Sequence, residues 1–357
     1  MMARRAAFAI PGDITTLTGG YIYERRLLEG LRHQGWDVQH IELADSFPMP
    51  SGTDMAASVA ALAEVDPTRP LILDGLVFGA IDTDGLATVG APIVAMIHHP
   101  LALESGLSPA LRDHLFRTER DNLRIAAHVL VPSPHTRSIL IERYEVSSGK
   151  IAIVRPGVAK PRIRSKPVEP PLILSVGIQH PRKGHDILVA ALERLRHIDW
   201  TAVIVGSAWD PAYADELALQ AANFGLGPRL RFEGRVEDAK LEELYRTAGI
   251  FALATRYEGY GIVFDEALAY GLPIVSCRTG AVPDTVPSDA GLLVPTDDSA
   301  AFADALADLL ENRDRRKALA DAAKRAGARL PGWNETARIA GTVLDRVAAE
   351  MGATHFR

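Results

Sequence analysis

Glu258-Gly-Tyr-Gly-Ile-Val-Phe-Asp-Glu-Ala-Leu-Ala-Tyr-Gly-Leu-Pro-Ile-Val-Ser276 is the stretch of sequence that decides the fold. The apolar run Ile250–Thr255 precedes it and is bounded by a turn signal, as expected for a buried parallel strand. A helix is predicted over Val263–Tyr270, because Gly271-Leu-Pro273 is typical of a helix end. Gly259–Ile262 therefore lie at the carboxyl end of a strand, which is where open α/β sheets bind ligands.

Two carboxylates, Glu258 and Glu266, lie on either side of this turn. The first N–H groups of a helix have no partner within it, and the helix dipole places positive charge behind them, so such a start can hold a phosphate. A carboxylate accepts hydrogen bonds and donates none, which suits it to sugar hydroxyls beside that phosphate. Acids near a helix start can also simply complement the dipole. The position of the turn after a buried strand favours a nucleotide-sugar site instead.

The composition limits the class of protein. The chain has 357 residues, 47% hydrophobic and 24% charged, which indicates a globular protein of two domains. A formal net charge of −6 and a pI near 6.0 argue against a nucleic-acid partner. Cys277 is the single cysteine and cannot form an internal disulfide, which fits a reducing cytoplasm. The first apolar run stops at Pro11, too early for a signal peptide or a membrane span.

Short apolar runs alternate with helical periodicity from end to end, which predicts an α/β fold with doubly wound parallel sheets. In the first half, strands are expected at Ala7–Ile10, Asp37–Leu43, Pro70–Asp74, Pro92–Ile97, His128–Val131 and Ile151–Val154. In the second half, strands are expected at Leu172–Val176, Ala202–Val205, Arg229–Phe232, Ile250–Thr255 and Ile274–Cys277. Helices are expected at Tyr21–Gln34, His185–Arg196, Ala212–Asn223, Ala239–Thr247, Ala301–Leu310, Arg315–Ala326 and Glu335–Glu350.

A proline-rich segment at 161–171 has no apolar periodicity and is predicted to be a linker. It separates a Rossmann-like domain at 1–160 from a second Rossmann-like domain at 172–332. The tail at 333–357 is expected to form a helix that packs back on the first domain. Two such domains should face an interdomain cleft, and ligands of such proteins bind at the domain boundary.

Three further stretches contain candidate site residues. Arg182 and Lys183 follow the first strand of the second half, where a guanidinium and an ammonium suit a diphosphate. We expect them to line the opposite wall of the cleft from Glu258 and Glu266. Gly19-Gly20 opens the first helix and allows close approach of a ligand. His98 follows the strand Pro92–Ile97 and could contact a sugar hydroxyl. Each has a plain structural alternative: solvated cations, an ordinary loop and a structural histidine.

Other classes of site are not supported by the sequence. Leu107–Ala127 could form an amphipathic helix on a membrane surface, but Asp113, Glu119 and Asp121 dilute its basic face, so a solvated domain helix is favoured. Peripheral association with the inner membrane face therefore stays open without being favoured. No zinc-ligand spacing and no Gly-x-Ser-x-Gly nucleophile motif occurs.

Taken together, these motifs resemble the family 4 glycosyltransferases, which are retaining enzymes of the GT-B architecture. The most specific part is the Glu-x7-Glu signature, Glu258 to Glu266, continued by Ala-Leu-Ala-Tyr-Gly-Leu-Pro-Ile-Val. The Gly-Gly turn, the strand followed by His98, Val176-Gly…Arg-Lys-Gly184, Phe232-Glu-Gly-Arg235 and Gly291-Leu-Leu-Val-Pro295 occur in the family's order. The chain departs from many members at Ile178, where they have Arg; Arg182 beside Lys183 resembles a subgroup that uses this cation instead.

The resemblance implies roles for individual residues. Glu266 would hold the donor ribose, Glu258 the transferred sugar, and His98 the sugar near the reacting carbon, while Arg182 and Lys183 neutralise the diphosphate. The remaining donor-binding residues implied by the resemblance lie on glycine-rich turns: Gly19, Gly20, Gly177, Gly259, Tyr260, Gly261, Ile262 and Val263. No metal and no cofactor is expected, since the two cations take the role of a divalent ion.

The implied reaction is transfer of a hexose from a UDP- or GDP-sugar to a hydroxyl of a glycan, lipid or small molecule, with retention of configuration. Positioning and charge stabilisation would supply most of the catalysis. Three alternatives remain open on the same architecture: a nucleotide-sugar epimerase, a sugar phosphorylase that uses inorganic phosphate, and a non-catalytic nucleotide-sugar binder. The nucleobase, the sugar, the acceptor and the oligomeric state do not follow from the sequence.

Overall fold

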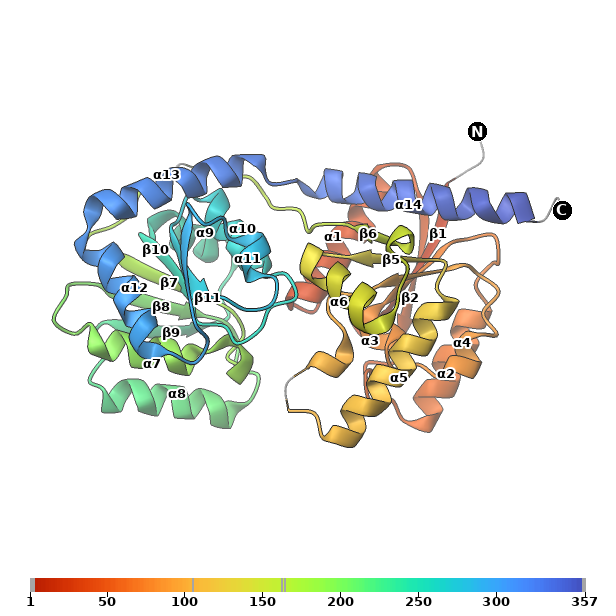
Figure 1. Ribbon diagram of the computed structural model, residues 1–357, viewed down its shortest axis with the longest axis horizontal. Coiled ribbons are helices and arrows are strands. Elements are labelled where there is room, and N and C mark those ends of the chain that lie inside the picture. The colour runs from red at the N-terminus through yellow and green to blue at the C-terminus, as the bar shows by residue number, and fades with distance from the viewer. Residues whose placement is uncertain (1–3, 105, 162, 164, 355–357) are drawn as a thin grey trace. The chain divides into compact units, whose positions relative to one another are not determined.

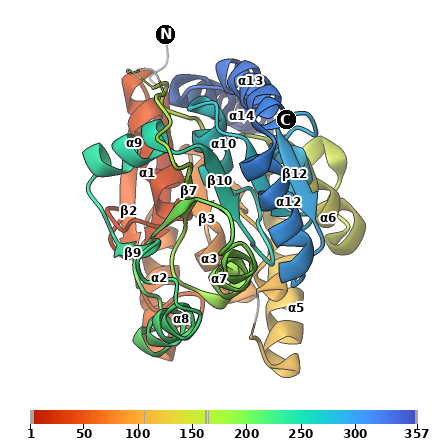
Figure 2. The ribbon, with the colours of Figure 1, turned by 90° about the vertical axis from the view of Figure 1, so that its left-hand side faces the viewer.

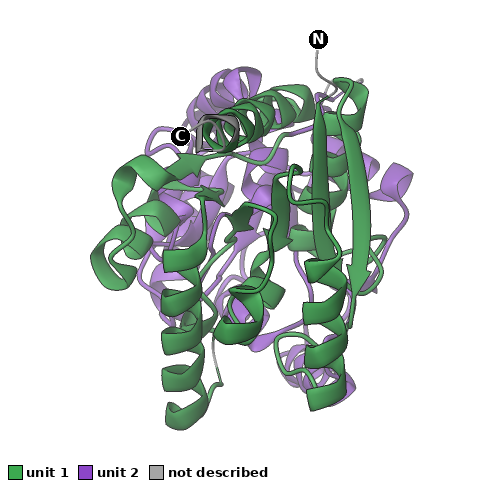
Figure 3. Ribbon diagram, turned by 90° about the vertical axis from the view of Figure 1, so that its right-hand side faces the viewer, with its two compact units in different colours: residues 1–157, 331–357 green, residues 158–330 purple. Residues whose placement is uncertain are grey.

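The computed structural model describes residues 4–104, 106–161, 163 and 165–354, the side chains of 352–354 excepted. The chain divides into two compact units, one of residues 1–157 with 331–357 and the other of residues 158–330 (Figure 3). The first unit therefore ends three residues before the expected boundary at 160, and the segment expected as a linker belongs to the second unit. Its backbone bonds there, with Lys166 N–H donating to Arg246 O at 2.7 Å.

The first unit is built on a six-stranded sheet in the order β2-β1-β3-β4-β5-β6, with every neighbouring pair parallel (Figure 1). Its strands are β1 Arg5–Pro11, β2 Asp37–Leu43, β3 Leu71–Asp74, β4 Ile93–Met96, β5 His128–Val131 and β6 Ile151–Ile153. Its α-helices are α1 Gly19–His33, α2 Gly52–Ala63, α3 Gly75–Phe78, α4 Thr83–Leu86, α5 Pro109–Ile125, α6 Pro134–Tyr144 and α14 Trp333–Thr354. Short 3-10 turns lie at η1 Leu101–Leu103 and η2 Ser148–Lys150.

Helices cover both faces of this sheet, because its central strands are apolar on both sides. Side chains two residues apart on a strand share a face. Ala7, Ala9 and their counterparts on β3, β4 and β5 form one core with α2, α5 and α6. Phe8 and Ile10, on the other face, are equally buried. The C-terminal helix α14 lies along α1 in this unit, where a Cβ on Gly30 would lie 2.7 Å from Cβ of Ala337.

The second unit has a six-stranded parallel sheet in the order β12-β11-β10-β7-β8-β9 (Figure 2). Its strands are β7 Leu172–Val176, β8 Thr201–Val205, β9 Leu230–Gly234, β10 Ile250–Leu253, β11 Ile274–Cys277 and β12 Gly291–Val294. Its helices are η3 Pro181–Lys183, α7 His185–Arg194, α8 Pro211–Asn223, α9 Asp238–Thr247, α10 Ile262–Ala269, α11 Val282–Thr285, α12 Ser299–Glu311 and α13 Arg313–Arg329.

Two hydrophobic cores lie on the two faces of this second sheet. Ile173, Ile204 and Ala252 pack with α7 and α12 on one face. Leu174, Val203 and Phe251 pack with α9, α10 and α13 on the other. The two parallel sheets confirm the predicted fold class. Among the described residues, no helix combines the length and the apolar character that crossing a membrane requires.

Candidate active site

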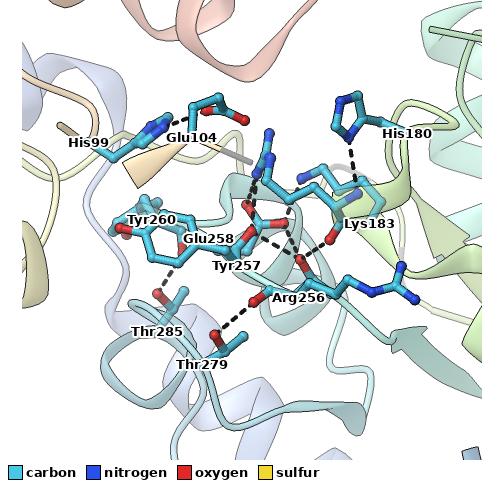
Figure 4. A network of polar contacts seen from close by, with 12 residues as sticks. His99, Glu104, His180, Lys183, Arg256, Tyr257, Glu258, Tyr260, Thr279 and Thr285 are labelled. Carbon is cyan, nitrogen blue, oxygen red and sulfur yellow. Dashed lines mark hydrogen bonds and ion pairs between the residues drawn. The ribbon is translucent and has the colours of Figure 1, made fainter. Parts of the chain in front are cut away.

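A connected polar cluster of the second unit surrounds Glu258, in the turn between β10 and α10 (Figure 4). Lys183 Nζ lies 2.6 Å from Glu258 Oε1, and a guanidinium nitrogen of Arg182 lies 3.7 Å from Glu258 Oε2. Glu258 is buried, with 5% of its surface exposed. The turn before α10 and the loop after β7 are thus joined by an ion triad of two cations and one carboxylate.

The loop that presents the two cations is held from several directions. Arg182 N–H donates to Nδ1 of His180 at 3.0 Å, and Arg182 O accepts from Arg256 N–H at 2.8 Å. Gly184 then turns the chain into α7 at φ +65°. A Cβ there would lie 1.9 Å from Ala254 O, so any larger residue would separate the cation loop from β10. Local geometry therefore fixes the position of both cations.

The electrostatics of the cluster favour an additional anion. Burial alone would raise the pKa of Glu258, but the charges of Lys183 and Arg182 outweigh burial and hold this pKa below its ordinary value. Thr255 adds a hydrogen bond from its hydroxyl to Glu258 Oε1 at 3.2 Å. Two cations and one ionised carboxylate leave a net charge of +1. That charge can be matched by a ligand anion.

Gly261 opens helix α10 at φ +86°, where a Cβ would meet the Phe264 ring at 2.6 Å. Only glycine fits this turn. Phe264 N–H donates back to Gly261 O at 3.0 Å, so the N–H groups of Ile262 and Val263 are the ones that the start of a helix leaves without an intrahelical partner. Tyr260 and Val263 flank the turn; Tyr260 O accepts from the Thr285 hydroxyl at 2.9 Å. The helix start at the carboxyl edge of the sheet agrees with the geometry expected for Gly259, Gly261 and Ile262.

Glu266 lies one turn into α10 and has a different environment from Glu258. Its Oε2 accepts a hydrogen bond from the Tyr245 hydroxyl at 2.7 Å. Tyr245 is held by the ring of Tyr270, which stacks on it at 5.3 Å between centroids. Burial raises the pKa of Glu266 to about 7. The two acids of the signature are therefore distinct, one ion-paired and ionised, the other poised to change charge near neutral pH.

The expectation that the acidic pair and the Arg-Lys pair line opposite walls of a cleft is wrong for Glu258. Glu258, Arg182 and Lys183 belong to one unit and are in direct contact. The sequence patterns predicted Glu258, Arg182 and Lys183 as candidate site residues. Whether these side chains touch depends on how far apart β7 and β10 lie in the sheet. The two strands are neighbours in the sheet. Lys183 and Glu258, which follow them in the chain, are 75 positions apart in the sequence. Gly177 lies under the Lys183 side chain, where a Cβ would come 3.3 Å from Cδ.

In the first unit, the predicted site residues Gly19, Gly20 and His98 come together with two acids. Gly19 begins α1, and a Cβ on Gly20 would lie 3.7 Å from the His98 ring. His98 Nε2 lies 3.2 Å from Oε1 of Glu24, one turn further along α1. Asp74, the last residue of β3, completes a group whose ligand atoms all lie within 4.8 Å of one another.

Sequence reasoning missed four residues of these two clusters: Glu24, Asp74, Thr255 and Tyr245. Glu24 lies in a charged helical stretch, Glu24-Arg-Arg26, that gives no sign of its burial. Asp74 could have been found from the sequence, because it is an acid at the end of an apolar strand. His98 was predicted from a similar position, since it follows an apolar strand. Tyr245 lies on the apolar face of α9, where an aromatic residue predicts only packing.

Two family models match the chain. One, described as glycosyl transferases group 1, covers residues 159–326, and the other, Glycosyltransferase Family 4, covers residues 78–160. A D-inositol 3-phosphate glycosyltransferase of Xylanimonas cellulosilytica is 34% identical over 216 residues, which are 56% of this chain and 52% of that protein. A GDP-mannose-dependent alpha-(1-6)-phosphatidylinositol monomannoside mannosyltransferase of Mycobacterium tuberculosis is 32% identical over 214 residues, 54% of each chain. The match thus spans about half the length of these relatives.

A solved structure extends the likeness to nearly the whole chain. The sucrose-phosphate synthase of Thermosynechococcus elongatus superposes with a TM-score of 0.82 at 22% identity, covering 97% of this chain and all of that one. At this level of identity the likeness concerns the fold. The fold that the two proteins share is the GT-B fold, with two domains that are each built on a parallel sheet.

Proposed function

Because the chain belongs to the family 4 glycosyltransferases, we propose that it transfers a hexose from a nucleoside diphosphate sugar to an acceptor hydroxyl, with retention of anomeric configuration. The observation that supports this proposal best is the ion triad of Lys183, Arg182 and Glu258. It lies at the carboxyl ends of two neighbouring parallel strands, which is the position at which such sheets bind nucleotides. Family membership then gives the class of reaction.

The two cations have a direct role in the proposed reaction. When the bond between the sugar and the diphosphate breaks, negative charge grows on the departing phosphate oxygens. A guanidinium and an ammonium fixed in advance stabilise this charge without reorganising. The first N–H groups of α10, after Gly261, are suited to the same phosphates. Glu258, held in place by Lys183, is suited to accept hydrogen bonds from hydroxyls of the transferred sugar.

We propose that no metal ion is required, because Arg182 and Lys183 supply the positive charge that a divalent cation supplies in other transferases. Turnover should then persist in the presence of a chelator and should not rise when Mg²⁺ or Mn²⁺ is added. A strict dependence of turnover on either ion would contradict this part of the proposal. Glu266 is assigned to the donor ribose and His98 to a hydroxyl of the transferred sugar.

The relatives direct the choice of donors and acceptors to assay first. One relative is named as GDP-mannose-dependent, and another as acting on D-inositol 3-phosphate. We therefore propose GDP-mannose and UDP-sugars as the first donors, and inositol phosphates and inositol lipids as the first acceptors. Binding of each donor is measured by thermal shift, since a ligand at a hundred times its dissociation constant stabilises the protein by about 2.7 kcal/mol.

The decisive assay is transfer of the sugar from the donor that gives the largest shift, with the anomeric configuration of the product read by NMR. Donor alone, donor with inorganic phosphate, and donor with acceptor are compared in parallel. Transfer only with acceptor, giving a product of the donor's anomeric configuration, supports the proposal. Conversion of the donor alone to its epimer would indicate an epimerase, and release of sugar phosphate would indicate a phosphorylase. Binding without any turnover in all three mixtures would indicate a nucleotide-sugar binder.

A further inference from the structure

Three titratable side chains meet at the carboxyl edge of the first unit's sheet. Glu24 comes from α1, Asp74 from the end of β3, and His98 from the loop after β4. Glu24 and Asp74 are each 2% exposed, whereas the His98 side chain is 25% exposed. His98 Nε2 faces Oε1 of Glu24 at 3.2 Å. Two acids are thus buried behind a histidine that reaches the surface.

The hydrogen bonds within this group limit where the protons can be. Glu24 and Asp74 are hydrogen-bonded to each other, which requires a proton between two oxygens. Leu76 N–H already donates to Asp74 Oδ1 at 2.9 Å, and the Nε2 side of His98 faces Glu24. A neutral Asp74 that donates to an ionised Glu24, which also accepts Nε2–H of a neutral His98, satisfies each of these contacts. Two adjacent buried carboxylates could not both ionise.

The electrostatics agree with this arrangement. Burial, followed by the nearness of Glu24, raises the pKa of Asp74 well above its ordinary value. Burial raises the pKa of Glu24 to about 7, whereas the hydrogen bond with Asp74 acts in the opposite direction and lowers it, as expected when Asp74 holds the shared proton. Burial lowers the pKa of His98, which keeps the imidazole neutral. Among the described residues, none is seen to hydrogen-bond Nδ1 of His98, and the Tyr23 ring packs edge-on against the imidazole at 5.4 Å between centroids.

We propose that Glu24 and Asp74 share one proton and act as positioning residues for His98, so that Nε2–H is donated to Glu24 and Nδ1 is presented as a hydrogen-bond acceptor to a sugar hydroxyl. The sugar hydroxyl rests on the proposed function, whereas the orientation of the ring does not. Glu24 fixes the tautomer and orientation of the imidazole, and Asp74 supplies the proton that lets Glu24 remain buried beside it. His98 then meets its ligand with the ring already in place.

The orientation is tested by NMR of the ¹⁵N-histidine-labelled full chain, with the His98 signals assigned from the His98→Asn variant. We expect the wild type to show a ring N–H resonance at Nε2 that is protected from solvent exchange. Glu24→Met should abolish this resonance, and Glu24→Gln, which keeps an oxygen acceptor but no charge, should retain it with weaker protection. Asp74→Asn should preserve it, because the amide donates to Glu24 as the carboxylic acid does.

Glu104→Gln is the matched control, because Glu104 Oε2 accepts from the neighbouring His99 ring at 2.6 Å and does not touch His98. It should leave the His98 resonance unchanged. A resonance that persists in Glu24→Met, or that disappears in Asp74→Asn, would overturn the proposal. So would one equivalent of bound metal in the purified wild type that is lost in Glu24→Gln, because the three side chains would then be metal ligands.

The role toward the substrate is tested by kinetics on the same variants. We expect Glu24→Met to lower kcat by up to about a hundredfold with little change in the donor KM, because ring misplacement affects the reacting geometry. Glu29→Gln, an exposed position on the same helix, should leave kcat unchanged. Normal kcat in a folded Glu24→Met variant that has lost the resonance would overturn the substrate role. If the wild type transfers no sugar from any donor, the proposed function fails, and the NMR result alone decides the positioning of His98.

Discussion

At the scale of single residues, substitution of Lys183 is expected to lower the catalytic efficiency. Its ammonium lies 2.6 Å from Glu258, and its side chain is 12% exposed. We predict that Lys183→Ala lowers kcat/KM about a hundredfold, equivalent to about 3 kcal/mol of transition-state stabilisation. Steady-state kinetics with the donor found by thermal shift measures this effect. Lys240→Ala is the matched control, since Lys240 is an exposed lysine paired with Glu243 at 3.0 Å.

Loss of the same size in Lys240→Ala, or unchanged turnover in Lys183→Ala, would remove Lys183 from the site. Melting curves of both variants are needed, because Lys183→Ala leaves the buried Glu258 with Arg182 as its remaining cation. A folded protein with lowered turnover separates the loss of catalysis from the loss of structure. Residue types and spacing predicted Lys183 and Glu258 as candidates. Their contact did not follow from spacing, because an ion pair depends on strand order.

Glu266 gives a prediction about pH at the same scale. Its pKa is raised to about 7 by burial, so the fraction of carboxylate rises from pH 6 to pH 8. If the carboxylate accepts hydrogen bonds from the donor ribose, affinity for GDP or UDP should rise with pH by up to about tenfold over that range. Isothermal titration calorimetry of wild type and Glu266→Gln separates this effect from titration of the ligand phosphate, which both proteins share. Parallel pH dependence in the two proteins would exclude Glu266 from nucleotide binding.

At the scale of elements, helix α5 contains a buried acid with no role in the proposed reaction. Glu119 is fully buried, and burial raises its pKa to about 8. The folded state therefore retains a proton that the unfolded chain releases near pH 4.5. The stability that depends on this proton is complete below pH 4.5 and is lost as pH rises through 8. Glu119→Gln cannot lose a proton and should escape this loss.

We expect the wild type to lose about 2 to 3 kcal/mol of stability between pH 6 and pH 9 relative to Glu119→Gln. Urea denaturation of both proteins at three pH values, followed by circular dichroism, measures the difference. Glu193→Gln on α7, whose partly exposed side chain pairs with Arg196, is the control and should follow the wild type. If the difference between wild type and Glu119→Gln stays constant with pH, Glu119 does not retain its proton in the folded state.

The elements also show how much of the fold can be predicted from the sequence. Apolar runs with clear ends, such as β7 and β11, agree with their predicted bounds. Strand β12 was not predicted, because Gly291-Leu-Leu-Val294 is short and resembles a loop until it pairs with β11. Helix α2 was also not predicted; its residues are mostly small, and few of them are buried. Periodicity identifies elements that bury a stripe of large side chains and misses those defined by their neighbours.

At the scale of the whole molecule, the chain crosses between the two units twice. Residues 158–330 form the second unit, and the chain then returns to the first, where α14 packs on α1. Gly157 fits closely against this return, since a Cβ there would lie 2.3 Å from Trp333 N. Thr336 donates to Arg155 O at 2.9 Å, and Ala337, Ala340 and Leu344 have no exposed surface. The last helix is therefore part of the first unit's core although it is distant in sequence.

Deleting residues 331–357 should consequently destabilise the first unit and leave the second unit's sheet intact. Loss of α14 uncovers the apolar face of α1, whereas both cores of the second unit lie within residues 158–330. Hydrogen exchange measured by mass spectrometry should show faster exchange in β1 and α1 and unchanged protection in β7, β8 and β10. The truncated chain should also bind the nucleoside diphosphate, GDP or UDP, because the ion triad is intact. Loss of protection in both sheets would show that α14 stabilises the chain as one cooperative body, and nucleotide binding would be lost with it.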